Sequence, residues 1–292
     1  MFEGFEERKV ATAKGEMFCR IKGDGPPLLL IHGHPQTHLM WYKTAPALSE
    51  RFTVIAADIR GCGDSMAPES DATHYAYSKR RMALDMVEMM EALGWSRFFV
   101  AGHDRGGRVA HRMARDHRDR VAAMSVLDIC PTLDMYEDTD MDFAIAYFHW
   151  FFLIQPYPLP ERMILANPRK WMDSCSQKWS GGHEFGPVEE AYLEAFSPPH
   201  KVHACCEDYR ASNTIDLDHD REDRDHKLTI PVHALWGGRG VVGRKWQPLE
   251  VWQRYTTGNV TGRAMNSGHF IPEEDPEATI AELLEFFSRQ SL

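Results

Sequence analysis

The segment over residues 97–113 constrains the fold of this chain most strongly. A short apolar run, residues 97–101, leads into Gly102-His103-Asp104-Arg105-Gly106-Gly107, and a helical pattern follows. A nucleophile with small residues two positions away on each side is typical of a sharp strand-to-helix turn, where glycine relieves crowding around a strained residue. The residue at this turn is Asp104, and simple capping of the helix is the alternative explanation for it.

The rest of the chain alternates between strand and helix patterns. Residues 77–93 and 277–287 carry apolar residues at helical spacing. Five apolar runs are typical of buried parallel strands: residues 27–31, 52–57, 97–101, 122–127 and 232–236. This order predicts an α/β fold with a mostly parallel central sheet and helices on both faces.

Residues 135–226 interrupt the alternation. They are rich in aromatic residues and in helical periodicity, without strand runs, so we expect an inserted helical cap between core segments 1–134 and 227–292. Alternating acids over residues 216–227 suggest a calcium loop. However, Arg221 and Lys227 stand where that loop needs Gly and Glu, so the pattern favours a solvated charged connector.

Charge and cysteine content limit the partners and the compartment. The 33 Lys and Arg residues against 43 Asp and Glu give a formal net charge of -10, which argues against a nucleic-acid or membrane partner. The N-terminus has no apolar signal region, and no run approaches the ~20 apolar residues of a spanning helix. Six scattered cysteines without a C-x-x-C pair suit reduced thiols. We therefore expect a cytoplasmic protein.

A histidine and an acid follow in the order that a catalytic triad needs. A carboxylate such as Asp104 attacks an alkyl carbon without a base and leaves an ester on the enzyme. His269, in Ser267-Gly268-His269-Phe270, precedes the last helix and is the candidate base. The run after residue 236 holds no carboxylate, whereas the strand before the cap ends in Asp128. Asp128 is thus the candidate orienting acid, with a turn or capping role as its alternative.

Hydrolysis of such an ester requires an oxyanion hole, usually of two backbone N–H groups. The amide of Arg105, after the nucleophile, and the amide of His34, in the loop after the first core strand, are the candidates. His32, His34 and His38 lie close in sequence, but no helical His pair with a carboxylate accompanies them, so we expect no metal.

Two arginines follow the nucleophile. Arg105 and Arg108 are three residues apart in a first helical turn, where they share a face and would orient a substrate carboxylate. Arg112 and Arg115, further along the same helix, are expected to be ordinary surface arginines.

Four motifs together resemble the fluoroacetate dehalogenases of the α/β-hydrolase superfamily over nearly the whole chain: His32-Gly33-x-Pro35-Gln36-Thr37, Asp58-x-Arg60-Gly61-x-Gly63-Asp64-Ser65, residues 102–108, and His149-Trp150. The resemblance implies a haloacetate dehalogenase that converts fluoroacetate and water into glycolate and fluoride through an aspartyl ester. It implies Asp104 as nucleophile, His269 as base and Asp128 as its acid. It further implies that Arg105 and Arg108 hold the substrate carboxylate. His149, Trp150 and Tyr209 would donate to the leaving fluoride. A homodimer without cofactor is implied as well.

Alternatives remain open at this point. His149 and Trp150 also suit simple packing of the cap, and Trp179 is a candidate for the pocket entrance. An epoxide hydrolase uses the same Asp-His-Asp set with cap tyrosines, for which Tyr147, Tyr157 and Tyr192 are available. A non-catalytic binding protein on the same scaffold is the third possibility. The chain departs from the family at His34, where Phe is common, so this side chain is expected to alter substrate size or pH dependence.

Overall fold

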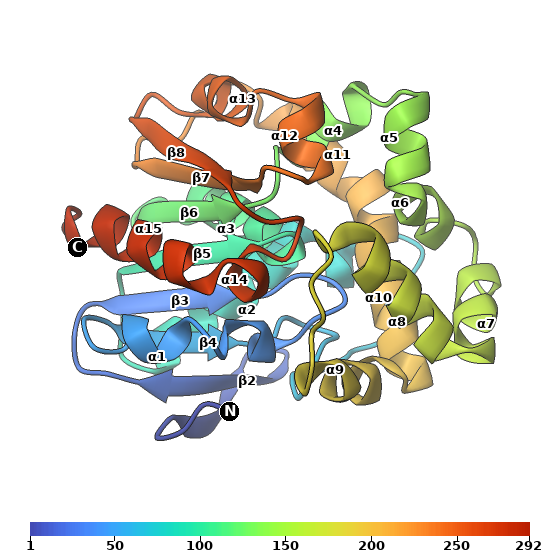
Figure 1. The fold of residues 1–292 in the computed structure, drawn as a ribbon, viewed down its shortest axis with the longest axis horizontal. Helices are drawn as coiled ribbons and strands as arrows, with labels where there is room; N and C mark the ends of the chain where they lie inside the picture. The colour runs from blue at the N-terminus through green and yellow to red at the C-terminus, as the bar shows by residue number, and fades with distance from the viewer.

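The computed structural model describes residues 1–292 and contains one sheet of eight strands in the order β1-β2-β4-β3-β5-β6-β7-β8 (Figure 1). Strands β3 to β8 are parallel, and β1 and β2 form an antiparallel hairpin that joins the sheet through β4. The strands are β1 (Glu6–Thr12), β2 (Gly15–Lys22), β3 (Pro27–Ile31), β4 (Thr53–Ala57), β5 (Phe98–His103), β6 (Val121–Leu127), β7 (Val232–Gly237) and β8 (Val260–Met265).

Both faces of the sheet are covered, because every residue of β3, β4, β5 and β6 is buried. Alternate residues of β3 point to opposite faces: Leu28 and Leu30 belong to one hydrophobic cluster, and Leu29 and Ile31 belong to the other. Helices α1 (Ala45–Leu48) and α15 (Pro276–Ser288) contribute to the first cluster; α2 (Lys79–Ala92), α3 (Arg105–Asp116) and α13 (Pro248–Tyr255) contribute to the second. Four short helices complete the core: η1 (His38–Trp41), η2 (Tyr75–Tyr77), α12 (Val241–Lys245) and α14 (Ile271–Glu274).

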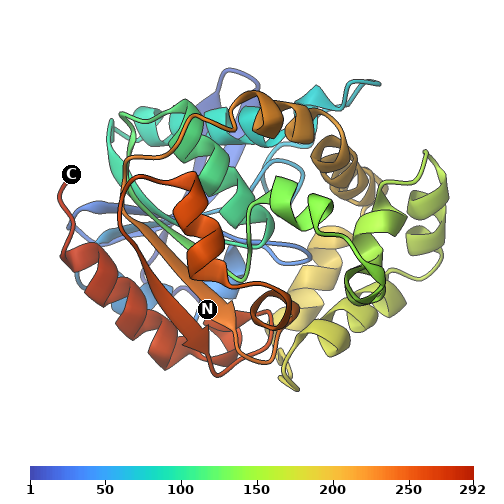
Figure 2. The same ribbon diagram turned by 90° about the horizontal axis from the view of Figure 1, so that it is seen from above.

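The chain between β6 and β7 contains helices and no strand. Most of this insertion lies to one side of the sheet, at the right of Figure 1, and the view from above in Figure 2 shows the same separation. We propose that it is a cap domain with the expected bounds, 135–226, of which the first falls within α4. The helices between β6 and β7 are α4 (Thr132–Glu137), α5 (Met141–Ala146), α6 (Phe148–Leu153), α7 (Leu159–Ala166), α8 (Pro168–Trp179), α9 (Val188–Phe196), α10 (Pro199–Asn213) and α11 (Ile215–Glu222).

The predicted fold class is confirmed, and three strands were missed. The five apolar runs correspond to β3 to β7, while β1, β2 and β8 lie at or near the two ends of the sheet. Strand β1 buries only Val10, and β8 buries only Met265, so neither has the continuous apolar run by which a central strand is found. No helix combines the length and the apolar character that crossing a membrane requires.

One expectation about surface charge holds only in part and one was wrong. The acidic stretch is only partly a solvated connector: Asp216 and Asp220 are buried in α11, whereas residues 224–227 are exposed. Arg112 and Arg115 are not surface arginines either: both are buried and reach Asp220, and Arg112 also contacts Asp223. Asp220 and Asp223 thus pair with arginines of α3 that lie 105 and 111 positions away in the two side-chain hydrogen bonds formed, a distance that a local reading of charge does not cover.

Candidate active site

The nucleophile candidate occupies a strained turn between β5 and α3. Asp104 has φ 45° and ψ −115°, and its side chain accepts no hydrogen bond from the first turn of α3, so helix capping does not explain it. The neighbouring glycines cannot carry side chains. A Cβ on Gly102 would lie 2.4 Å from the carbonyl oxygen of Gly106, and a Cβ on Gly106 would lie 2.4 Å from that of His32. Glycine at positions 102 and 106 therefore permits the tight turn in which Asp104 adopts a non-helical backbone conformation.

Asp104 is ionised and held by the loop after β3. Its Oδ2 accepts a hydrogen bond from the backbone N–H of His34 at 3.0 Å. Burial alone would raise the pKa of Asp104, but the charges of His269, Arg105 and Arg108 outweigh burial and lower it below its ordinary value. The group is thus a carboxylate at neutral pH and needs no base to act as a nucleophile.

Asp128 and His269 meet beyond the ends of β6 and β8. His269 Nδ1 is 2.6 Å from Asp128 Oδ2, and Asp128 Oδ1 accepts from the amide of Gly237 at 2.9 Å. Burial would lower the pKa of His269, but its hydrogen bond to Asp128 and the charge of that carboxylate raise it. With its Nδ1 proton donated to Asp128, the imidazole keeps Nε2 as a base.

The two predicted oxyanion-hole donors are backbone groups beside Asp104. The His34 amide already reaches the carboxylate, and a Cβ on Gly33 would lie 2.6 Å from the Cβ of Asp104, so this loop approaches closely only because residue 33 is glycine. Arg105 is the first residue of α3, where the backbone N–H has no acceptor within the helix.

Arg105 is fixed by the insertion. Its Nε and Nη2 donate to the two oxygens of Asp208 in α10, at 2.7 and 2.8 Å, and Nη2 also donates to Ser212 Oγ at 2.5 Å. The guanidinium lies 4.2 Å from the centre of the Tyr209 ring. Its Nη1 is buried without a hydrogen-bond partner, so one donor stays free for a ligand.

Arg108 is a buried cation without a carboxylate partner. Its Nη1 donates to the Cys130 carbonyl at 3.2 Å and to Thr132 Oγ1 at 3.0 Å, and its guanidinium lies 4.7 Å from the centre of the Trp150 ring. Burial, followed by the charge of Arg105, lowers its pKa. A guanidinium that is 3% exposed and lacks a counter-ion is costly, which favours binding of an anion here.

Three predicted halide donors are also buried and unsatisfied. His149 and Trp150 come from α6 and Tyr209 comes from α10; none is more than 3% exposed. His149 Nδ1, Trp150 Nε1 and the Tyr209 hydroxyl have no hydrogen-bond partner. The rings of His149 and Tyr209 are 5.7 Å apart, and Trp179, 4.3 Å from the His149 ring, accepts from the His269 amide through its carbonyl. Buried polar atoms without a hydrogen-bond partner are available to bind a ligand.

Sequence reasoning missed the residues that hold Arg105. Asp208 binds both Arg105 and Lys79 of α2, and Ser212 lies one helical turn further on. The one available signal was that Asp208 has no basic residue three or four positions away in its helix, and therefore needs a partner elsewhere. No group of His, Cys, Asp or Glu side chains is arranged to hold a metal ion.

The strained turn after β5, the acid and histidine beyond β6 and β8, and the helical insertion define the chain as an α/β hydrolase. The family described as the α/β hydrolase fold matches residues 26–276, and the chain belongs to it.

Relatives within this family have two different activities. The chain is 41% identical to the fluoroacetate dehalogenase of Burkholderia sp, over 99% of this chain and 95% of the relative, so the resemblance seen in the sequence is confirmed. It is 35% identical to the soluble epoxide hydrolase of Corynebacterium sp. (strain C12), over 91% of each.

Solved structures agree with this placement. A protein of Nostoc sp PCC 7120 assigned to the α/β hydrolases is 47% identical, with a TM-score of 0.95 over 99% of this chain and 100% of that one. A Pseudomonas aeruginosa protein assigned as an epoxide hydrolase is 41% identical, with a TM-score of 0.92 over 98% of this chain and 96% of that one.

Proposed function

We propose that this chain is a haloacetate dehalogenase that converts fluoroacetate and water into glycolate and fluoride through an ester on Asp104. The observation that carries the proposal is Arg108, a buried guanidinium without a carboxylate partner whose charge acts on Asp104. A haloacetate supplies the missing anion and places its carbon near the nucleophile. The 41% identity to a fluoroacetate dehalogenase supports the same substrate class.

The first step breaks the carbon–halogen bond. The substrate carboxylate binds Arg108 and the free Nη1 of Arg105, and one oxygen of Asp104 attacks the α-carbon. A carbon–oxygen bond forms, the carbon–fluorine bond breaks, and its electron pair leaves with fluoride. The unsatisfied N–H and O–H groups of His149, Trp150 and Tyr209 donate to this developing charge, which water would otherwise have to solvate.

The second step hydrolyses the ester. His269 Nε2 takes a proton from water, and the oxygen of that water attacks the carbonyl carbon of Asp104. The amides of His34 and Arg105 hold the oxyanion, and Asp128 stabilises the imidazolium. Collapse of the intermediate breaks the bond between the Asp104 carbonyl carbon and the glycolate oxygen, and the imidazolium returns its proton to that oxygen. The carboxylic acid left on Asp104 then releases the second proton of the water to solvent, which restores the carboxylate.

Epoxide hydrolysis is the second candidate, because the free Tyr209 hydroxyl would suit protonation of an epoxide oxygen. Two of the expected tyrosines do not fit: the Tyr192 hydroxyl is bound to Glu273 at 2.9 Å, and Tyr157 is 68% exposed. Tyr147 is buried with its ring 5.3 Å from His149. Whichever tyrosine protonates the epoxide, a neutral substrate would leave the charge of Arg108 without a counter-ion.

The assay for this proposal is fluoride release from fluoroacetate, followed with a fluoride electrode, beside styrene oxide as the competing substrate. The chain should release fluoride and Asp104→Ala should not. Turnover of styrene oxide without fluoride release would favour the epoxide hydrolase, and haloacetate binding without turnover would favour the binding protein.

The six unpaired cysteines support a reducing, cytoplasmic location, and the family resemblance supports a homodimer. Sedimentation of the purified chain measures the oligomeric state directly.

A further inference from the structure

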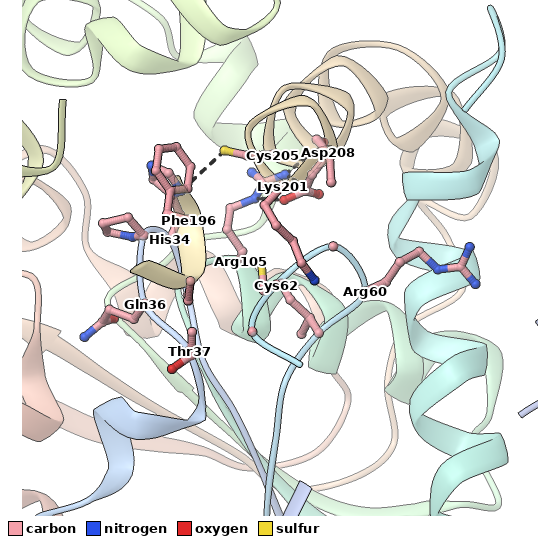
Figure 3. Close-up of a pocket in the computed structure, with 17 residues that line it drawn as sticks. His34, Gln36, Thr37, Arg60, Cys62, Arg105, Phe196, Lys201, Cys205 and Asp208 are labelled. Atoms are coloured by element: carbon pink, nitrogen blue, oxygen red, sulfur yellow. Dashed lines mark hydrogen bonds and ion pairs between the residues drawn. The ribbon is translucent and has the colours of Figure 1, made fainter. Parts of the chain in front are cut away.

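The backbone amide of His34 reaches Asp104, whereas its side chain lies among aromatic residues. It is 7% exposed, and its ring centre lies 5.6 Å from that of Phe196, 5.8 Å from Tyr209 and 6.4 Å from Trp179. His34 and Arg105 also line a cavity of about 30 Å³, drawn in Figure 3, whose lining includes neither Asp104 nor the proposed halide donors. The imidazole thus stands among the aromatic side chains that surround the proposed halide end of the site.

One nitrogen of this ring has a partner and the other has none. Nδ1 lies 3.4 Å from Cys205 Sγ, the contact drawn as a dashed line in Figure 3, whereas Nε2 is buried without a partner. Burial raises the pKa of the Cys205 thiol, so the sulfur keeps its proton. Burial lowers the pKa of His34 to about 4, so the ring is neutral near pH 7. When the thiol donates to Nδ1, the single ring proton sits on Nε2.

The His34 ring shares two aromatic neighbours with His149, one of the proposed halide donors. The Tyr209 ring lies 5.8 Å from His34 and 5.7 Å from His149, and the Trp179 ring lies 6.4 Å and 4.3 Å from the same two residues. A buried N–H without an acceptor is expensive. His34 Nε2 lies on a ring next to Tyr209 and Trp179, whose own hydroxyl and indole N–H are also unpaired, and a bound acceptor would satisfy such groups.

We infer that the His34 side chain is a specificity-determining residue that donates a fourth hydrogen bond to the halide end of the substrate. The inference rests on the proposed dehalogenation and adds a contact that the resemblance does not supply. Fluoride concentrates its charge more than bromide does, so an additional donor favours fluoride as the leaving group.

The direct test compares two leaving groups in His34→Phe, which keeps an aromatic ring and removes both nitrogens. Fluoride release from fluoroacetate should fall roughly tenfold, while bromide release from bromoacetate should fall less than about threefold. His200→Phe is the matched control, because His200 is exposed on α10, the helix that carries Cys205. The control should change neither rate. An equal fractional loss with both substrates in His34→Phe would overturn the inference and assign His34 to packing.

A second pair of variants tests the proton position. Cys205→Ala removes the donor to Nδ1 and should lower the fluoride-to-bromide ratio, whereas Cys205→Ser restores a hydroxyl donor and should recover it. Equal ratios in these two variants would contradict the assignment of the proton to Nε2.

Halide binding separates this inference from the proposed function. Sodium chloride is titrated while tryptophan fluorescence is followed; Trp150 and Trp179 are two of the 8 tryptophans that contribute to the signal. His34→Phe should weaken chloride binding roughly fivefold. If the parent chain releases no fluoride but His34→Phe still weakens chloride binding, the dehalogenase proposal fails and the donor role of His34 stands. Unchanged chloride affinity in a folded His34→Phe variant would overturn the donor role whether or not the parent chain is a dehalogenase.

Discussion

Replacing Arg108 by leucine should separate activity from stability. The substitution removes the guanidinium that has no carboxylate partner. Two charge-assisted hydrogen bonds to the substrate carboxylate, each worth about 1.5–3 kcal/mol, correspond to a loss of roughly two to four powers of ten in kcat/KM. The folded chain no longer buries an uncompensated charge, so its free energy of unfolding should stay within about 1 kcal/mol of the parent or rise.

The assay measures kcat/KM for fluoroacetate and for fluoroacetamide, together with urea unfolding. Arg108→Leu should lose its preference for the acid over the amide, because the amide lacks the charge that Arg108 binds. Arg112→Leu is the matched control one turn further along α3: its guanidinium contacts Asp116 and Asp223, so its removal should lower stability by more than about 1 kcal/mol and spare the acid preference. An unchanged preference in Arg108→Leu, or a loss of several kcal/mol of stability, would refute this account.

Four further outcomes follow from the two-step chemistry. Single turnover in heavy-oxygen water should place the label in Asp104, and label found only in glycolate would exclude the ester. His269→Asn should release one halide per site and retain a mass adduct on the Asp104 peptide; a variant with neither burst nor adduct would give His269 another role. Because Asp128 raises the pKa of His269, Asp128→Asn should slow ester hydrolysis and move the acidic limb of its pH profile to lower pH, and an unmoved limb would contradict the pairing. Trp150→Phe should reduce fluoride release steeply while bromoacetate hydrolysis persists, whereas equal losses would make Trp150 a packing residue.

The sequence predicts the centre of this fold better than its edges. Strands β3 to β7 are found as apolar runs because helices cover both faces of the sheet there. Strands β1 and β8 form its two edges and carry mostly exposed residues, so no apolar run marks them. Strand β2 does not alternate regularly between buried and exposed residues, and it is recognised as a strand only from its pairing with β1 and β4.

The same limit applies within the site. Residues in motifs around the turn after β5 are recognisable because local backbone geometry demands them, as the close contacts of Gly102 and Gly106 show. The contact between Arg105 and Asp208 joins positions 103 apart in the chain, and only the folded arrangement reveals it. The placement of the His34 ring proton on the unpaired Nε2 likewise depends on the contact between Nδ1 and Cys205, a residue of α10 that no local pattern connects to His34.

The two halves of the proposed reaction draw on different parts of the molecule. Asp128 and His269, which would hydrolyse the ester, lie beyond the strand ends of the sheet, whereas three of the four proposed halide donors, His149, Trp150 and Tyr209, stand on α6 and α10 of the insertion. Asp208 of α10 also holds Arg105, so the position of the insertion sets the carboxylate clamp and the leaving-group contacts together. A chimera that carries the insertion of another family member would therefore inherit much of that member's choice of bond to break, while its ability to hydrolyse an esterified aspartate would remain that of the host sheet.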